Sequence, residues 1–116
     1  MKKILIIDDD PKVVEYLVDL LKDNGYATAS AINAQEALEL VNSEHFDLIT
    51  LDLEMPGDWG PRFYSKMVKN MNLKNIPVIV ISGMSGNDYA ISKAVASLTK
   101  PFDRKELLKI IRDVLS

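Results

Sequence analysis

Short apolar runs alternate along this chain with longer amphipathic segments, and this alternation restricts the fold more than any other feature. Residues 4–7 and 77–81 are apolar at every position, and within the run 47–51 only Asp47 and Thr50 are polar. Strands that are apolar on both faces are typical of a parallel sheet covered by helices on both sides. Between the runs, apolar residues such as Leu17 and Leu21 recur at helical spacing. The sequence therefore predicts an α/β fold with a doubly wound, parallel, five-stranded sheet.

Capping and turn residues indicate where these elements begin and end. Asp10 followed by Pro11 is typical of a helix start, and Gly25 suits the position just after a helix end. Asn33 and Asp103 are expected to cap two further helices. We expect strands at residues 4–7, 26–30, 47–51, 77–81 and 95–99. The second of these is the weakest, and we expect it at an edge of the sheet.

The stretch between the third and fifth strands is less regular. Its Pro and Gly content predicts a loop at residues 55–60. A third helix is expected next, with Phe63, Met67 and Met71 on its buried face. Residues 85–93 hold a short helix at most.

Composition excludes several classes of protein. A chain of 116 residues fits one domain, residues 1–116, and 47% hydrophobic residues allow a substantial core. There is no cysteine, so disulfides and thiolate chemistry are excluded, and we expect a cytoplasmic protein. The apolar runs are far shorter than the roughly 20 residues that span a membrane. The net charge of −3 argues against nucleic acid as a direct partner.

Polar side chains follow the predicted strands at the point where each one ends. Asp8, Asp9 and Asp10 follow the first strand, and Asp52 follows the third. Ser82 ends the fourth strand and Lys100 ends the fifth. Ligands of doubly wound sheets bind at the carboxyl ends of the strands, so these side chains should meet at one rim.

Crowded carboxylates repel one another unless a cation or a proton joins them. A hard cation with oxygen ligands, Mg²⁺, suits such a cluster and accepts phosphate oxygens. The ammonium group of Lys100 and the hydroxyl of Ser82 would complete a site for a phosphoryl group held in line with a carboxylate.

Each residue also has a simpler structural interpretation. Asp10 fits a helix cap better than a metal ligand, and His45 fits a solvated position at a helix end. Trp59 fits partial packing in its loop. The charged residues of the last helix fit a solvent-exposed face; they are Arg104, Lys105, Glu106, Lys109 and Arg112. Taken together, however, the acids, the hydroxyl and the lysine at one rim are poorly explained as ordinary strand ends.

These residues resemble the receiver domains of two-component response regulators, and the resemblance covers nearly the whole chain. The matching motifs, in order, are Ile4-Leu5-Ile6-Ile7-Asp8-Asp9-Asp10-Pro11, Asp52-Leu53-Glu54-Met55-Pro56-Gly57 with Gly60, Ser82-Gly83, and Lys100-Pro101-Phe102. Each motif is weak alone, but the combination and order are highly specific. The resemblance implies the flavodoxin-like strand order 2-1-3-4-5, with a shortened fourth helix.

The resemblance also implies a role for each site residue. Asp52 would accept a phosphoryl group from a sensor histidine kinase, a phosphotransfer protein or a small acyl-phosphate donor. Asp9 and Asp52 would ligate Mg²⁺ directly, together with the backbone carbonyl of Glu54, and Asp8 would act through a metal-bound water.

Two further residues would respond to the phosphoryl group. Lys100 would pair with its oxygens, and the bond from Lys100 to Pro101 would be cis, as in the family. Ser82 would swing inward to hydrogen-bond it, and this motion would switch a surface that binds an unknown downstream protein. A phosphorylation-dependent dimer is a further expected form of association.

Two departures from the family concern the output surface. The 18 residues from Ser82 to Lys100 are fewer than usual by roughly four, about one helical turn. In addition, Ser97 stands where the family usually has an aromatic residue that moves with the hydroxyl. The acceptor chemistry is complete, whereas the usual relay through the fourth helix, fifth strand and last helix is incomplete; Tyr89 is a candidate substitute for the aromatic.

Two rival functions stay open at this point. A pseudo-receiver would keep the fold as an interaction module without phosphorylation. A haloacid-dehalogenase-type phosphatase would use Asp8 as the nucleophile of an Asp8-x-Asp10 motif, although the residues that follow do not match that family. Whether the receiver stands alone or is a piece of a longer chain is open as well.

Overall fold

The structure is a computed structural model that describes residues 1–53, 62–63, 65–66, 69, 73, 75–83 and 95–116. Its elements are the strands β1 (Lys3–Ile7), β2 (Ala27–Ala31), β3 (Leu48–Leu51), β4 (Val78–Ser82) and β5 (Ala96–Thr99), and the helices α1 (Pro11–Asp23), α2 (Ala34–Ser43) and α4 (Arg104–Leu115). The predicted strands are confirmed with shifts of about one residue at their ends. The proposed short helix at residues 85–93 lies outside the described residues.

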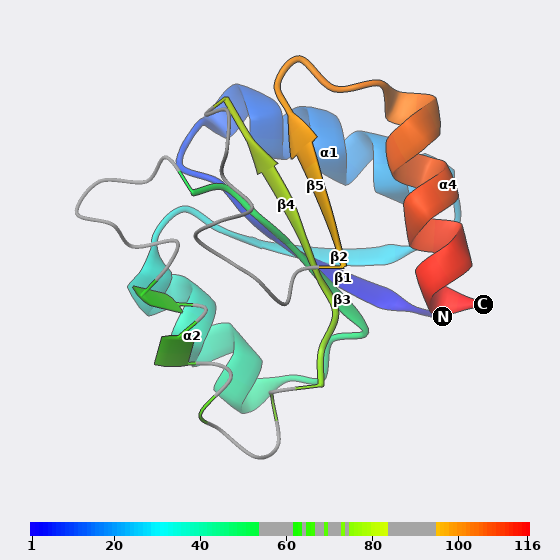
Figure 1. The fold of residues 1–116 in the computed structure, drawn as a ribbon. Coiled ribbons are helices and arrows are strands. Elements are labelled where there is room, and N and C mark those ends of the chain that lie inside the picture. Colours follow the sequence, from blue (N-terminus) through cyan, green and yellow to red (C-terminus); the bar gives the residue numbers. More distant parts are fainter. Residues whose placement is uncertain (54–61, 64, 67–68, 70–72, 74, 84–94) are drawn as a thin grey trace.

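All five strands are parallel and form one sheet in the order β2-β1-β3-β4-β5 (Figure 1). This confirms the predicted flavodoxin-like order, including the position of β2 at an edge. The chain first builds outward from β1 to β2 and then returns to place β3 on the other side of β1. The carboxyl ends of β1 and β3 therefore border the point where the strand order reverses, which is where doubly wound sheets bind their ligands.

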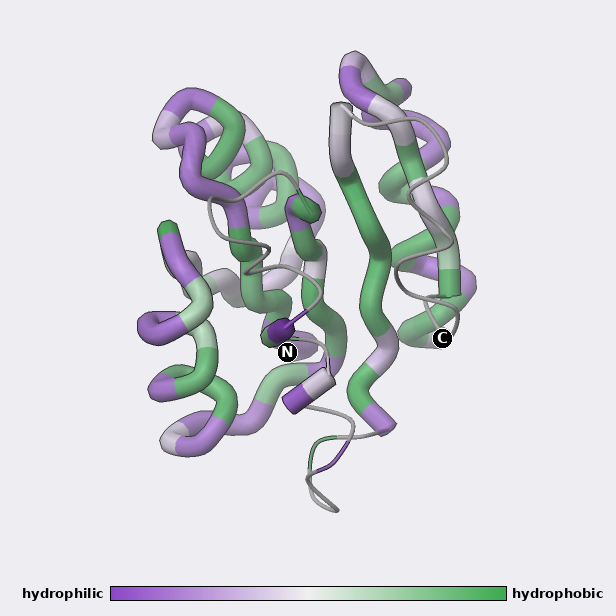
Figure 2. The backbone as a smooth tube through the Cα atoms, turned by 60° about the vertical axis from the view of Figure 1, so that its left-hand side comes forward, coloured by the Kyte–Doolittle hydropathy of each residue, from purple (hydrophilic) through white to green (hydrophobic). Residues whose placement is uncertain are grey.

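Helices cover both faces of the sheet, and each face has its own core. On one face α1 and α4 pack through Leu17, Leu21, Leu107 and Ile111 onto the strands. On the other face α2 packs through Ala34, Ala37 and Val41, joined by Phe46 and Phe63. In Figure 2 the central strands are mostly hydrophobic along their length, whereas hydrophilic and hydrophobic residues follow one another within the turns of the helices. This is the pattern from which the doubly wound fold was predicted.

The predicted caps are confirmed. The side chain of Asp10 accepts a hydrogen bond from the backbone N–H of Lys12 at the start of α1, and Asn33 and Asp103 cap α2 and α4 in the same way. Gly25 follows the end of α1 with φ of 89°, the left-handed conformation that glycine adopts most readily. The expected buried position of Phe63 is also confirmed; Met67 and Met71 lie outside the described residues. Among the described residues, no helix combines the length and apolar character that crossing a bilayer requires.

A group of hydrogen bonds and ion pairs joins the beginnings of β1 and β3, at the end of the sheet opposite Asp8 and Asp52. The backbone N–H of Lys3 donates to Asp47 Oδ2 at 2.8 Å, and the backbone N–H of Asp47 donates to the Lys3 carbonyl at 2.8 Å. The Lys3 ammonium pairs with Glu44, and the exposed ring of His45 lies 3.1 Å from Asp47 Oδ1. The hydrogen bond from Lys3, aided by His45, lowers the pKa of the Asp47 carboxyl.

We expect Asp47 to stabilise the fold in a pH-dependent way. Because its pKa is depressed in the folded state, its contribution is complete above the unfolded value of about 3.9 and is lost as pH falls through the lower folded value. Denaturant titrations should therefore show Asp47→Ala less stable than the parent at pH 7, with the difference shrinking below about pH 4. The exposed Asp113→Ala serves as control. An equal difference in stability between Asp47→Ala and the parent at pH 7 and below about pH 4 would contradict this assignment.

Candidate functional site

The ends of β1 and β3 are held together by main-chain hydrogen bonds that continue past the strands. The N–H of Asp8 donates to the Ala31 carbonyl on β2 at 3.1 Å, and the N–H of Asp52 donates to the Ile7 carbonyl on β1 at 2.9 Å. Both aspartates are thus fixed by backbone that is nearly as regular as the strands themselves. Their side chains are almost fully buried, with 2% of Asp8 and 3% of Asp52 exposed.

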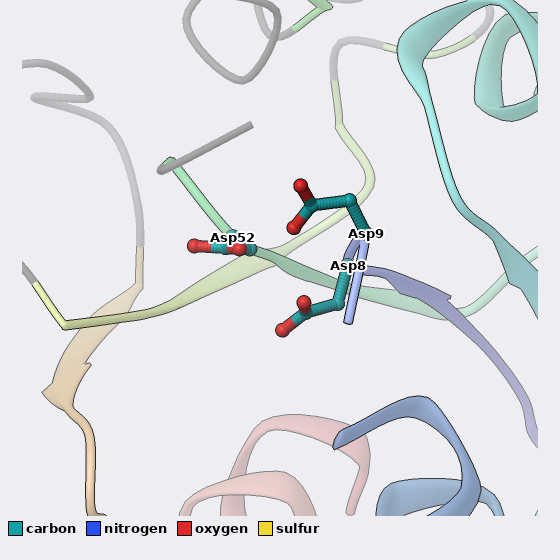
Figure 3. A group of neighbouring side chains, drawn as sticks. All are labelled: Asp8, Asp9 and Asp52. Atoms are coloured by element: carbon teal, nitrogen blue, oxygen red, sulfur yellow. The ribbon is translucent and has the colours of Figure 1, made fainter. Parts of the chain in front are cut away.

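Three carboxylates gather at this rim. Asp8 and Asp9 project from the end of β1 toward Asp52 at the end of β3 (Figure 3). One carboxylate oxygen from each of the three lies within 4.8 Å of the others, and Asp9 is the exposed member of the group. The cluster is therefore open to solvent on one side and enclosed on the other.

Lys100 brings a positive charge to the same place from the end of β5. Its ammonium Nζ donates to Asp8 Oδ2 at 2.8 Å and lies 3.6 Å from Asp52 Oδ2. The backbone N–H of Lys100 donates to the Ser82 carbonyl at 2.9 Å, which ties the ends of β4 and β5 together. The peptide bond between Lys100 and Pro101 is cis, as expected from the sequence.

Asp8 is held by two hydrogen bonds, one on each oxygen. Oδ1 accepts the backbone N–H of Asp10 at 2.9 Å, and Oδ2 accepts the ammonium group of Lys100. The side chain of Asp10 is in turn occupied in capping α1, so it is not part of the acidic cluster. The direct pairing of Asp8 with Lys100 did not follow from the sequence, because their separation of 92 residues carries no local signal.

Ser82 is the last residue of β4 and is fully buried. Side chains alternate along a strand, so Ser82 shares the α2 side of β4 with Val78 and Val80, whereas Ile79 and Ile81 face α1 and α4. Ser82 and Lys100 thus lie at the ends of two neighbouring strands, β4 and β5.

One divalent cation can balance the net charge of the side chains at the rim. Three carboxylates and one ammonium group give a formal charge of −2 for Asp8, Asp9, Asp52 and Lys100. Mg²⁺ prefers oxygen ligands at about 2.0–2.1 Å, so two ligand oxygens on one ion can be at most about 4.2 Å apart. The carboxylate oxygens lie within 4.8 Å of one another, a limit slightly wider than this maximum, and the donor set is the one that Mg²⁺ favours. The residues present therefore fit a magnesium ion.

Comparison with known proteins identifies the family. The family model described as the response regulator receiver domain matches residues 4–112. The chain belongs to this family. The resemblance drawn from the sequence motifs is thereby confirmed, and so is the receiver-domain fold.

Several relatives resemble this receiver domain over its whole length. Protein Rrf1 of Nitratidesulfovibrio vulgaris is 36% identical over 114 residues, which cover 98% of this chain and 83% of Rrf1. The response regulator TrrA of Thermotoga maritima in complex with Mg²⁺-BeF is 32% identical with a TM-score of 0.89, covering 99% of this chain and all of TrrA. In the complex of the Thermotoga maritima histidine kinase ThkA with TrrA, the matching chain gives 32% identity and a TM-score of 0.87, with both chains fully covered. The receiver domain spans about half the length of other relatives, which are named as transcriptional regulators.

Not every residue singled out in the sequence can be placed in this receiver domain. The structure brings Asp8, Asp9, Asp52 and Lys100 together, and it puts Ser82 on the strand beside Lys100. Glu54, expected to offer its backbone carbonyl to the metal, lies outside the described residues, as do Trp59 and Tyr89. Ser97, which replaces the usual aromatic residue, lies exposed on β5.

Proposed function

We propose that this receiver domain accepts a phosphoryl group on Asp52, in a reaction that requires Mg²⁺, and thereby switches a surface that binds a partner. The observation that carries the proposal is the cluster of Asp8, Asp9 and Asp52 beside the ammonium group of Lys100. Such an arrangement can hold a carboxylate nucleophile and neutralise an incoming phosphoryl group in one place. The complex of the relative TrrA with Mg²⁺-BeF supports this use of the site.

Asp9 and Asp52 would hold the magnesium ion directly, with the backbone carbonyl of Glu54 as a third protein ligand and Asp8 acting through a water molecule. Bound Mg²⁺ neutralises charge on the phosphoryl oxygens and helps to orient the group. Asp8 suits an indirect role because its two oxygens already accept hydrogen bonds from Asp10 and Lys100.

In the transfer step, a carboxylate oxygen of Asp52 attacks the phosphorus atom of the donor. A new bond forms between that oxygen and phosphorus, and the bond from phosphorus to the donor atom breaks. The donor atom is the imidazole nitrogen of a phosphohistidine or the carboxylate oxygen of a small acyl phosphate, and it keeps the electron pair. A carboxylate nucleophile, unlike a hydroxyl, has no proton to lose in this step, so the step needs no general base.

Lys100 and Ser82 would then hold the transferred group. The ammonium group of Lys100 already lies 3.6 Å from Asp52 Oδ2, so a small movement away from Asp8 brings it to a phosphoryl oxygen. The hydroxyl of Ser82 would donate a second hydrogen bond from β4. These charge-assisted bonds favour one of two conformations of the neighbouring surface, which is the proposed switch.

A sensor histidine kinase or a phosphotransfer protein is the proposed source of the phosphoryl group. The complex of the histidine kinase ThkA with TrrA, which is similar to this chain over its full length, supports a kinase partner. A downstream protein would recognise the switched surface, and association of two phosphorylated copies belongs to the same proposal.

Intact-mass measurement tests the acceptor directly. Incubation with a small acyl phosphate and Mg²⁺ should add the mass of one phosphoryl group, and Asp52→Asn should abolish the gain, because an amide is a poor nucleophile. Asp113→Asn, a matched change on the exposed face of α4, should keep the full gain. Chelation of Mg²⁺ should also remove it.

The same experiment separates the rival functions. A pseudo-receiver would gain no mass under any condition, and that result would overturn the proposal. A haloacid-dehalogenase-type phosphatase would carry its phosphoryl group on Asp8, so the gain would persist in Asp52→Asn and disappear in Asp8→Asn. Both outcomes differ from the one expected here.

A further inference from the structure

The outer edge of β2 presents main-chain groups that the sheet does not use. β2 pairs only with β1, and the N–H of Ala27 and the carbonyl of Ala31 are bonded toward the chain of β1 at 2.9 and 3.1 Å. A residue of a parallel strand directs its N–H and C=O to the same neighbour, so those of Thr28 and Ser30 point away from β1. Within the described part of the chain, these groups have no hydrogen-bond partner.

The sequence of β2 does little to block this edge. Its residues, Ala-Thr-Ala-Ser-Ala, include no charged residue and no proline, although such residues commonly protect edge strands from pairing with another chain. Ile32, directly after the strand, is 52% exposed and adds apolar surface at the same place. The edge is therefore able to accept a further strand, bonded to the main chain of Thr28 and Ser30.

A hollow of about 390 Å³ lies between this edge and one flank of α2. Its lining residues are Ser30, Glu36, Glu39, Leu40 and Ser43. Glu36 Oε1 accepts the backbone N–H of Ile32 at 3.0 Å, which fixes this side chain near the end of β2. Glu39 is exposed and makes no hydrogen bond or ion pair with another described residue. The hollow thus has an acidic wall that suits a cationic side chain.

The charge beside the edge indicates which kind of strand fits it. Glu36 and Glu39 are three residues apart on α2, a spacing that puts Cβ atoms about 5–6 Å apart. In an added strand, side chains two residues apart lie on the same face with a spacing of about 6.6 Å. Two cationic residues at such positions can therefore each meet one carboxylate. Antiparallel pairing of two copies of β2 would instead bring a second pair of glutamates beside the first, and like charges disfavour that arrangement.

We propose that the outer edge of β2 binds an extended segment of a partner protein as an added strand, with Lys or Arg residues of that segment in the hollow beside α2. Main-chain hydrogen bonds to Thr28 and Ser30 supply affinity, and the alternating cations supply specificity. The site lies at the edge of the sheet opposite β5. None of its residues belongs to the phosphoryl site, so this docking is independent of the function proposed for Asp52.

NMR of the ¹⁵N-labelled protein tests the docking with a synthetic peptide, Thr-Lys-Val-Lys-Val-Lys-Thr, as the probe. The peptide should bind with a dissociation constant below about 1 mM. The amide signals of Thr28 and Ser30 should shift more than those of Asp9 and Asp52. An ionic strength of about 1 M, where the Debye length is roughly 3 Å, should weaken binding. The same peptide with Glu in place of each Lys should bind about tenfold more weakly or worse.

Two changes in the protein separate the main-chain contribution from the charge. Ser30→Pro removes the outward N–H, and the fold should tolerate it because an edge strand accommodates proline where the N–H faces solvent. Glu39→Lys reverses the exposed charge of the hollow, and it tests the charge even if Ser30→Pro unfolds. Each should weaken peptide binding by about tenfold or more.

A matched charge reversal on the opposite face of the sheet supplies the control. Asp113→Lys on α4 changes one exposed acid in the same way and should leave peptide binding unchanged. Circular dichroism shows which variants remain folded. No binding at about 5 mM peptide, binding insensitive to both Ser30→Pro and Glu39→Lys, or shifts confined to the acidic cluster would each overturn the proposal. A dimer of the protein alone that Ser30→Pro abolishes would assign the edge to a second copy and would overturn it as well.

Discussion

Replacing Lys100 by methionine should lower the free energy of unfolding by about 3 kcal/mol in metal-free buffer, because it leaves two buried carboxylates without their cation. The ammonium group of Lys100 contacts Asp8 at 2.8 Å and lies 3.6 Å from Asp52. Methionine keeps a flexible chain of similar length, so packing changes little. Chemical denaturation in the presence of a chelator is the measurement.

Magnesium should reverse much of this loss, which separates an electrostatic cause from a packing defect. A ligand present at about 100 times its dissociation constant adds roughly 2.7 kcal/mol to stability. The three carboxylates of Lys100→Met should gain more from Mg²⁺ than those of the parent, since no lysine competes for them. The exposed Lys105→Met should lose less than about 0.5 kcal/mol. A full-sized loss that Mg²⁺ does not reduce would contradict this view of the cluster.

Phe46→Ala should cost about 3–5 kcal/mol, a large share of the roughly 5–15 kcal/mol that stabilises a typical domain. Phe46 is 1% exposed and fills the core between the end of α2 and the start of β3. The Lys3 ammonium also lies 5.3 Å from the centre of its ring, so truncation removes a cation–π contact as well. Thermal or denaturant unfolding would measure the loss.

The conservative variant shows whether volume is the cause. Phe46→Leu keeps most of the apolar volume and should cost less than about 1.5 kcal/mol. A loss below about 1 kcal/mol for Phe46→Ala would mean that the site collapses around the cavity or that Phe46 contributes little to this core.

The fold was predictable because its strongest signals are local. The apolar runs of β1 and β4 indicate strands buried on both faces. The pairs Asp10–Pro11 and Asn33–Ala34 mark helix starts through hydrogen bonds that span only a few residues. The strand order followed from the family resemblance and not from these patterns, since pairing between strands depends on contacts far apart in sequence. The predicted ends of the strands differ from the observed ends by about one residue, because the last hydrogen bonds of a strand also depend on its partner strand.

The candidate site was predictable in its membership but not in its contacts. Placing Asp8, Asp9, Asp52 and Lys100 at one rim needs only the rule that parallel strands end on the same side of a sheet. The hydrogen bond between Lys100 and Asp8 depends instead on how β5 lies beside β4 and on the direction of a long side chain. The contribution expected from Glu54 stays a prediction.

The most direct test is an NMR titration of the ¹⁵N-labelled protein, first with Mg²⁺ and then with beryllofluoride as a mimic of the phosphoryl group. The amide signals of Asp8, Asp9 and Asp52 should shift on adding Mg²⁺, and those of Ser82 and Lys100 should shift further with beryllofluoride. Asp9→Asn should weaken the first response. If millimolar Mg²⁺ leaves the signals of Asp9 and Asp52 unmoved, the two carboxylates do not share an ion, and phosphoryl acceptance at this rim is contradicted.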